Sequence, residues 1–334
     1  MKKNILFAFF ALATACPKAE SQQLPLFSEY LHNAFTMNPS MIGWDKITAA
    51  TAAYRHQWTD MPNAPRTAAL SYQQWEEPSN MAFGGFFMQD NTGPTSFTTL
   101  TLNYAYHIRM ASEKKGEFER NRLSIGLSLG GTVYRLRGRD LRYNDPDDLL
   151  IINANQSKFL PDVGVGLTYY NDMYYVGFSM PQLLSSRLRY TTPDAISNLR
   201  RVTHFYFNAG ARIPLKSNNK DIKQFLIPSF FMKFAPLSPL NLTATLRYMW
   251  NYKFSAGLGY STDGSLICDA NVNISKRFRV GYAFSIGLNG LAPYVGTTHE
   301  IMLTYVLASS GKNWAFEPLT KVWEKEPAKG CISF

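Results

Sequence analysis

A long alternating stretch, residues 95–110, constrains the fold of this chain more than any other feature of its sequence. Read with a period of two, it separates an apolar face from a face of small or polar residues. The apolar face carries Leu100, Leu102, Tyr104, Tyr106 and Ile108, and the other carries Thr99, Thr101, Asn103, Ala105 and His107. The pattern predicts a strand. Its apolar face would point at a core in a soluble sandwich and at lipid in an outer-membrane barrel.

The first 21 residues have the composition of a secretory signal. Lys2 and Lys3 precede an apolar run from Ile5 to Ala13, which is followed by small residues and is too short to span a membrane as a helix. Two cleavage sites remain open. Cleavage after Ser21 would release a chain that begins at Gln22, whereas a lipoprotein-like site before Cys16 lacks the usual leucine. We favour the first site and expect an exported protein.

Three further regions follow the leader. Residues 22–46 alternate poorly and predict a short helix with a loop, a possible plug for a lumen; residues 47–307 hold the strands; residues 308–334 form a tail. No apolar run reaches the ~18 residues of a membrane helix, so a membrane protein of this sequence has to be a barrel. The strand candidates are 47–56, 66–74, 81–90, 95–110, 121–136, 160–170, 173–179, 201–213, 223–233, 240–250, 252–260, 264–274, 277–288 and 298–307.

The connections between these strands differ in length in a way that favours a bacterial barrel. Tight turns are expected at Asn171, Asn251 and Ser275, and long loops at 137–159 and 180–200. Short periplasmic turns opposite longer outer loops are typical of such barrels, and an even strand count returns both termini to the periplasm. The predicted fold is therefore all-β: a transmembrane antiparallel β-barrel of about 14 strands with an N-terminal plug-like segment, placed in the outer membrane.

Strand parity also predicts what faces the lumen. Arg247 and Arg279 should point inward, because an arginine facing lipid at the midplane costs ~2–4 kcal/mol. Several inward positions are glycine, which either relieves curvature of the sheet or allows another backbone to approach closely. The second explanation predicts packing of residues 22–46 on the inner wall. The residues assigned to this packing are Gly126, Gly130, Gly164, Gly166, Gly257, Gly259, Asn38 and Pro39.

Candidate partner-binding residues lie near strand ends. Arg55, Gln57 and Trp58 close the first strand, and Arg and Trp are frequent binding anchors, although packing of the wall and plug is the role that we favour for them. Further arginines border the two long loops, where they would contact lipopolysaccharide phosphates or dock a passenger domain. These are Arg135, Arg137, Arg139, Arg142, Arg187 and Arg189.

The sequence gives little support to catalysis. The histidines are scattered over separate segments, and no serine stands in a nucleophile motif. No Cys/His spacing indicates a metal site, and no cofactor is expected. The net charge of +10 does not point to nucleic acid, since export removes that partner and no basic aromatic platform is present. We expect a protein that is not an enzyme.

Six motifs taken in order resemble the PorP/SprF family of the type IX secretion and gliding-motility machinery. They are PLFSEYLHNAFTMNPSMIG (25–43), YRHQW (54–58), NAPRTAALS (63–71), DNTGPTS (90–96), LNYAYHI (102–108) and HEIMLTY (299–305). The resemblance runs from Gln22 to Leu307. It implies an outer-membrane barrel that works with a secreted adhesin or cargo carrying a C-terminal sorting domain, and with periplasmic ring lipoproteins.

The tail departs from the family pattern, because such barrels usually end close to their last strand. Residues 308–334 carry Trp314 and Trp323 among charged residues. The tail would either fold back on the periplasmic rim of the barrel or dock a periplasmic partner through these tryptophans.

Two other functions stay open for the whole chain. One is a solute channel or fatty-acid-type transporter, the default for a barrel of this size; the other, disfavoured by the missing nucleophile, is an outer-membrane hydrolase.

Overall fold

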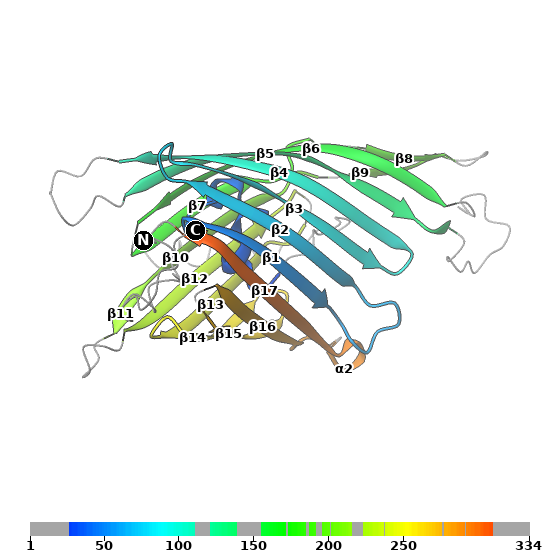
Figure 1. Ribbon diagram of the computed structural model, residues 1–334. Helices are drawn as coiled ribbons and strands as arrows, with labels where there is room; N and C mark the ends of the chain where they lie inside the picture. The colour runs from blue at the N-terminus through cyan, green and yellow to red at the C-terminus, as the bar shows by residue number, and fades with distance from the viewer. Residues whose placement is uncertain are drawn as a thin grey trace, which may run out of the picture.

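The fold is a closed antiparallel β-barrel, seen from the side in a computed structural model (Figure 1). The structure describes residues 27–110, 121–138, 155–171, 173–184, 187–191, 196–200, 202–215, 223–236, 238–275, 277–290 and 292–309. Each wall strand pairs with its neighbours along the chain, and β1 pairs with β17 to join the two ends of the strand series. Closure leaves no free sheet edge, as a membrane-spanning sheet requires.

The wall contains fourteen strands, which confirms the predicted fold class. β10 and β11 both pair with β12 in one continuous register and together form one wall strand. The wall strands are β1 (Ile47–His56), β2 (Arg66–Glu76), β3 (Met81–Thr92), β4 (Thr95–Arg109), β5 (Arg122–Leu136), β6 (Gln156–Tyr170), β7 (Tyr174–Met180), β10 (Phe205–Ala211) with β11 (Ile213–Leu215), β12 (Gln224–Phe234), β13 (Asn241–Trp250), β14 (Phe254–Ser261), β15 (Ser265–Asn273), β16 (Phe278–Gly287) and β17 (Thr297–Ser309).

A separate hairpin was not expected from the sequence. β8 (Arg187–Thr191) and β9 (Ile196–Arg200) pair only with each other, inside the predicted loop 180–200. The strand expected at 201–213 accordingly begins later, at Phe205. One short helix, α2 (Ala292–Val295), lies between β16 and β17. In the part of the chain that the structure describes, no helix has both the length and the apolar character needed to cross a membrane.

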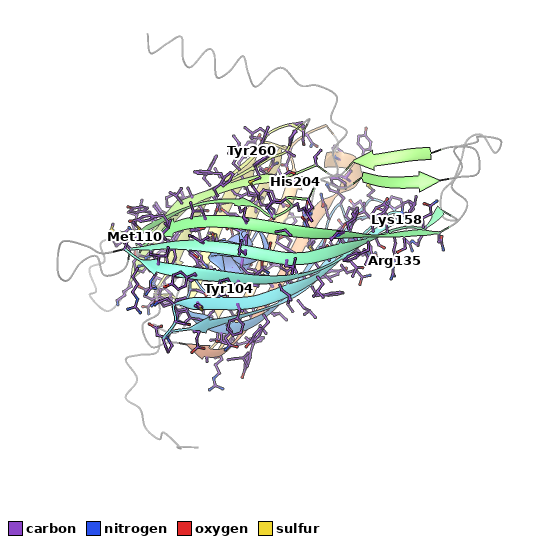
Figure 2. The ribbon with its side chains drawn as sticks, turned by 90° about the horizontal axis from the view of Figure 1, so that it is seen from above. Tyr104, Met110, Arg135, Lys158, His204 and Tyr260 are labelled. Carbon is purple, nitrogen blue, oxygen red and sulfur yellow. The ribbon has the colours of Figure 1, made fainter. Side chains whose placement is uncertain are left out.

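The two faces of the wall follow the period-two pattern. In β4, Leu102 is 63% exposed on the outside, while Asn103 is 5% exposed on the inside. Aromatic side chains such as Tyr104 and Tyr260 project from the outer surface, which Figure 2 shows with the side chains drawn. Arg247 and Arg279 are both buried inside, as strand parity predicted. The exterior therefore presents an apolar band that suits lipid.

The two ends of the barrel differ. β1 begins and β17 ends at one end, called here the terminal end; the opposite end is called the distal end (Figure 1). The long connections 137–155 and 181–204 lie at the distal end, and most terminal-end turns, such as 171–173 and 251–253, are short. Long and short connections are not completely separated between the two ends. Residues 110–121 connect β4 to β5 at the terminal end, and a tight turn at Gly93–Pro94 connects β3 to β4 at the distal end.

Residues 27–46, called here the lumenal segment, lie inside the barrel (dark blue in Figure 1). They form two short 3₁₀ helices, η1 (Tyr30–Thr36) and η2 (Pro39–Met41). Asn38 caps η2 by accepting from the Ser40 backbone N–H, and Pro39 occupies its first turn, where the missing N–H costs nothing. The buried side chains of the segment pack on apolar residues of the inner wall, Trp44 for example on Tyr170 and Tyr175.

Candidate functional site

The first described residues of the lumenal segment are tied to the seam between β1 and β17. The Ser28 backbone N–H donates to Glu300 Oε2 at 2.7 Å, and Ser28 Oγ donates to Glu300 Oε1 at 3.0 Å. Arg55 Nε lies 3.0 Å from the same Glu300 carboxylate, and Arg55 and Glu300 are register partners across the seam. Glu300 is 4% exposed, so its charge is compensated locally, as a buried carboxylate requires.

The next contacts reach β15 and β16, the two strands beside β17. Asn271 Nδ2 donates to Glu29 Oε1 at 3.0 Å, and Arg279 donates to His32 Nδ1. Burial, reinforced by Arg279 and Arg247, lowers the pKa of His32 well below its ordinary value. The imidazole is therefore neutral at pH 7, which leaves Nδ1 free to accept from a guanidinium.

A buried ion pair joins wall strands close to these contacts. Arg247 Nε donates to Asp269 Oδ2 at 2.9 Å, and both side chains are almost completely buried. The two residues belong to β13 and β15, on either side of β14. Gly257 of β14 lies between them, and a Cβ there would come within 2.4 Å of Asp269 Oδ1. This glycine makes room for the ion pair.

The middle of the lumenal segment lies on β5, β6 and β7. Asn38 Nδ2 donates to Thr168 Oγ1 at 3.0 Å, Ser124 Oγ donates to the Ser40 carbonyl at 2.6 Å, and Ser179 Oγ donates to the Met37 carbonyl at 2.9 Å. Small wall residues allow this approach. A Cβ at Gly126 would lie 2.1 Å from the Ser40 backbone nitrogen.

The predicted glycine contacts separate into two groups. Gly126 meets Pro39 and Ser40, and Gly166 meets Asn38, whose Oδ1 would lie 2.1 Å from an added Cβ. The remaining four have other nearest neighbours, and for Gly164 and Gly257 none of the three atoms nearest to an added Cβ belongs to the segment. Gly164 faces Ser128 and Pro181, Gly257 faces Asp269, Gly130 faces Leu100 and Thr101, and Gly259 faces Ala244 and Thr245.

The last residues of the segment are fixed at the terminal end of the barrel. The Gly43 backbone N–H donates to Gln73 Oε1 at 3.2 Å, and Gln73 Nε2 donates to both Asp45 carboxylate oxygens at 3.0 Å. Burial raises the pKa of Asp45 to about 6, although Gln73 opposes the shift. Gly43 has a φ of +69°, and a Cβ there would lie 2.3 Å from the Ala82 Cβ. Both the backbone conformation and the close contact therefore require glycine at this position.

A polar cavity of about 530 Å³ lies at the distal end, above the lumenal segment. Phe27, Ser28 and Tyr30 form part of its floor. Its walls carry charges of both signs and hydroxyl groups, among them Arg55, Lys233, Asp90, Asp263, Ser261 and Ser285. Gln57 and Trp58 line it as well, and Trp58 remains 39% exposed.

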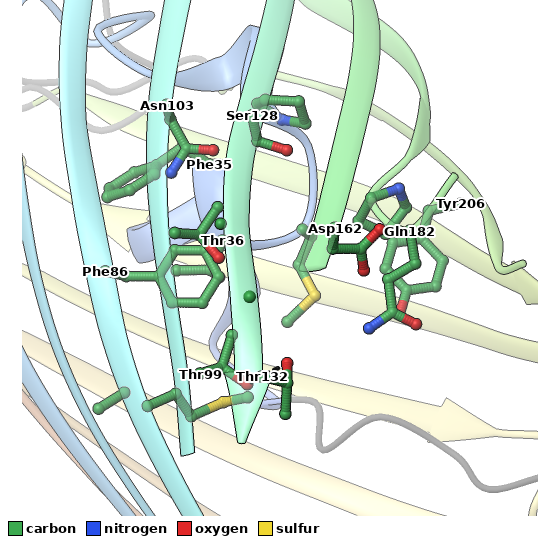
Figure 3. A pocket seen from close by; sticks show the side chains of 18 of the residues that line it. Phe35, Thr36, Phe86, Thr99, Asn103, Ser128, Thr132, Asp162, Gln182 and Tyr206 are labelled. Carbon is green, nitrogen blue, oxygen red and sulfur yellow. Dashed lines mark hydrogen bonds between the residues drawn. The ribbon is translucent and has the colours of Figure 1, made fainter. Parts of the chain in front are cut away.

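A second, mainly apolar cavity of about 70 Å³ lies between the lumenal segment and strands β3–β6 (Figure 3). Phe35 and Phe86 form one side of it, and Asp162, Gln182 and Tyr206 the other. Thr99 and Thr132 lie toward the distal end and are joined through their hydroxyl groups at 2.9 Å. Phe27 lines both cavities and thus separates them.

The structure brings only some of the predicted partner-binding residues together. Arg55, Gln57 and Trp58 share the polar cavity, with Arg55 ion-paired to Glu300. Arg135 and Arg137 are exposed at the distal end of β5, near Lys158 of β6 (Figure 2), and Arg137 donates to the Gly93 carbonyl at 2.7 Å. Arg187 and Arg189 belong to the β8–β9 hairpin. Arg139, Arg142, Trp314 and Trp323 lie outside the described residues.

Sequence reasoning missed Glu300, which binds the lumenal segment, and Asp269, which forms the buried ion pair with Arg247. Glu300 and Asp269 are acidic residues at inward positions of wall strands, opposite inward arginines. Inward parity combined with opposite charge could have suggested the pairs, but the contacts with Ser28 and Glu29 depend on the position of the segment in space. Among the described residues, no group of three or more His, Cys, Asp or Glu side chains is arranged to hold a metal ion.

Two solved structures of outer-membrane proteins are similar to this chain at low identity. No curated relative matches the chain. The Acinetobacter baumannii outer membrane protein Omp33 is similar at 9% identity, a TM-score of 0.39 and coverage of 79% of this chain and 99% of that one. The Pseudomonas putida toluene transporter TodX is similar at 10% identity, a TM-score of 0.41 and coverage of 86% and 95% respectively.

The family evidence covers most of the chain. The family described as "Type IX secretion system membrane protein PorP/SprF" matches residues 19–305, nearly the range over which the sequence motifs resemble it. The match includes the lumenal segment and thirteen complete wall strands, and it ends within β17. This chain belongs to the PorP/SprF family of type IX secretion system membrane proteins.

Proposed function

We propose that this barrel helps to secrete or anchor a cognate surface protein of the adhesin type, which it binds through the C-terminal sorting domain of that cargo. In this proposal the terminal end faces the periplasm, where the barrel contacts ring lipoproteins of the secretion and motility machinery. The distal end faces outward, among lipopolysaccharide. The barrel performs no covalent chemistry and serves as a membrane-embedded docking site.

The observation that carries the proposal is the lumenal segment. Its contacts run from Glu300 near the distal end, through Thr168 and Ser124, to Gln73 at the terminal end. They involve both sides of the wall, since Glu29 and His32 bind β15 and β16. An open solute route would need a clear path along the axis, so these contacts favour docking over transport.

The distal end offers a surface for the cargo. Trp58 and Gln57 border the polar cavity, whose walls combine two cationic and two acidic side chains. An exposed tryptophan beside a cavity is a typical anchor in an interface, where it buries a large area and retains an N–H donor. Trp58 also has a φ of +57°, an uncommon conformation that the surrounding turn has to maintain.

Substitution of Trp58 tests the proposal. In Trp58→Ala, we expect less cargo on the cell surface and less cargo co-purifying with the barrel, because truncation of an interface tryptophan commonly costs ~2 kcal/mol or more. Trp250→Ala is the matched control: Trp250 is similarly exposed, but it lies on the outer face of β13. Equal cargo loss in both variants, or none in Trp58→Ala at normal barrel levels, would contradict docking at this cavity.

The periplasmic contacts need a separate measurement. The tail residues Trp314 and Trp323 remain the candidates for binding ring lipoproteins. If they dock a partner, replacing both by alanine removes the periplasmic lipoproteins from the purified complex while barrel levels stay normal. If the tail supports assembly of the barrel, the same change lowers the amount of barrel itself.

A further inference from the structure

Two arginine side chains converge on one neutral oxygen at the terminal end of the barrel. Arg109 ends β4 and Arg122 begins β5, and the two residues are register partners. Met110, next to Arg109, lies at the end of the barrel opposite Arg135 (Figure 2). Arg109 Nε and Arg122 Nη1 each donate to Asn80 Oδ1 at 2.9 Å. This amide oxygen orients both guanidinium groups, but it carries no net charge and does not neutralise them.

The charges around this oxygen are unbalanced in the part of the chain that the structure describes. Arg122 and Lys46 are both buried, and they lie over the Trp75 ring, 5.8 Å and 5.4 Å from its centroid. Glu77 supplies a carboxylate whose oxygens both have partners: Lys46 Nζ lies 3.5 Å from Oε1, and Trp75 Nε1 donates to Oε2 at 2.7 Å. Lys46, Arg109 and Arg122 therefore share one carboxylate. A buried charge is stabilised by a partner of opposite sign, so an anion bound beside the two arginines would stabilise this group.

The strand positions of the two arginines show from which side an anion can approach. Arg109 follows the inward alternation of β4, on which His107 is buried. Arg122 belongs to the inward alternation of β5, on which Ser124 is buried. Both side chains therefore belong to the mouth of the barrel, where Arg109 is exposed, whereas the neighbouring Ile108 is on the outer, lipid-facing side. An anion can reach the arginines from the aqueous phase at the terminal end.

Guanidinium groups bind carboxylates and phosphates through charge-assisted hydrogen bonds. A phospholipid phosphate is held outside the wall by its acyl chains, whereas a carboxylate on a protein can enter the mouth. We propose that Arg109 and Arg122 form a carboxylate-binding site, which takes an acidic segment of a protein partner at the terminal end. The identification of that partner as a periplasmic protein rests on the proposed function, but the chemistry of the site does not.

Asn80→Asp tests the site without removing either arginine. It places a carboxylate where both guanidinium groups already donate, and aspartate tolerates the φ of +53° at this position. Asn63→Asp is the matched control, since Asn63 has a φ of +57° in a turn at the distal end. The probe is a fluorescein-labelled hexaglutamate peptide, and its anisotropy is measured with the purified full-length barrel in an uncharged detergent at low ionic strength. We expect equal affinity for the parent and Asn63→Asp, and about tenfold weaker binding to Asn80→Asp, whose new charge competes with the peptide.

Equal binding to the parent and Asn80→Asp, or no binding to either, would overturn the proposal. Two rival occupants have their own signatures. If the peptide binds only after Glu113→Gln, Glu117→Gln and Glu119→Gln are combined, the acidic residues of the chain itself occupy the arginines, and the proposal is wrong. It is also wrong if phosphatidylglycerol, and not the peptide, raises the thermal unfolding midpoint of the parent but not that of Asn80→Asp. None of these measurements involves cargo, so a failure of the docking function would appear with Trp58→Ala and leave them unchanged.

Discussion

Gly126 shows at the scale of one residue how the barrel accommodates a second backbone. It lies on the inner face of β5 opposite Pro39 and Ser40, where the two backbones touch with no side chain between them. The Ser40 carbonyl accepts from Ser124 on the same strand. Glycine in a strand normally weakens it, and here the contact with the lumenal segment offsets that cost.

We expect Gly126→Ala to destabilise the barrel by about 1–3 kcal/mol, because the new Cβ would lie 2.1 Å from a backbone nitrogen that cannot rotate away. The thermal unfolding midpoint of the detergent-solubilised barrel measures the effect. Gly290→Ala is the control, since no atom lies within 4 Å of a Cβ at that position. Similar midpoints for the two variants would show that the segment yields at this contact.

Asp45 gives the lumenal segment a pH dependence. Its pKa in the folded state is about 6, above the ordinary 3.8, because burial disfavours the carboxylate. The folded state therefore binds this proton more tightly than the unfolded state. The resulting stabilisation is complete below pH 3.8 and is lost as the pH rises through 6, and it amounts to roughly 3 kcal/mol at most.

In Asp45→Asn this contribution disappears. The free energy of unfolding of the parent protein should fall between pH 4 and pH 7 relative to that of Asp45→Asn, in which the amide cannot ionise. Denaturant titrations at several pH values measure the difference between the two proteins, and that difference removes the contribution of other titrating groups. Parallel pH profiles would mean that Asp45 ionises freely in the folded barrel.

At the scale of elements, the sequence predicts the strands much better than the contacts between them and the lumenal segment. The period-two pattern in β4 and the inward parity of Arg247 are local properties, so one strand at a time reveals them. Gly126 and Gly257 look alike in sequence, yet one meets Ser40 and the other Asp269. Which neighbour a glycine meets depends on strand stagger and on the path of the segment, and neither can be read from a local pattern.

Removal of the lumenal segment tests the proposed docking function against solute transport. Deleting residues 25–43 should open a large conductance in planar bilayers. The side chains of this segment pack against the inner face of the barrel wall and occupy part of the lumen. The parent barrel should conduct little. The comparison requires that the deleted form still shows the heat-dependent gel mobility of a folded barrel, and Asn38→Ala, which loosens the segment without removing it, should give an intermediate current.

Two results would count against this view. A parent barrel that conducts freely would favour the solute-channel alternative. A deleted form that folds, secretes cargo normally and conducts no better than the parent would show that the lumenal segment neither blocks the barrel nor supports its function.

For the whole molecule, the difference between its two ends predicts its orientation in the membrane. Single cysteines placed in the distal connections 137–155 and 181–204 should react with an impermeant maleimide on intact cells. A cysteine in the turn 251–253, at the terminal end, should react only after lysis. The parent chain without its native cysteines gives the background. The reverse labelling pattern would place the distal end in the periplasm and exclude the proposed outward docking surface.

The Ser28–Glu300 contact has a consequence for how the molecule is assembled. It joins residues 272 positions apart, so Glu300 becomes available only after nearly the whole chain has been made. The lumenal segment precedes β1 in the chain, yet one of its anchors belongs to the strand that closes the barrel on β1. Such long-range contacts form late in folding. The lumenal segment can therefore complete its contacts only after β17 has paired with β1 and closed the wall.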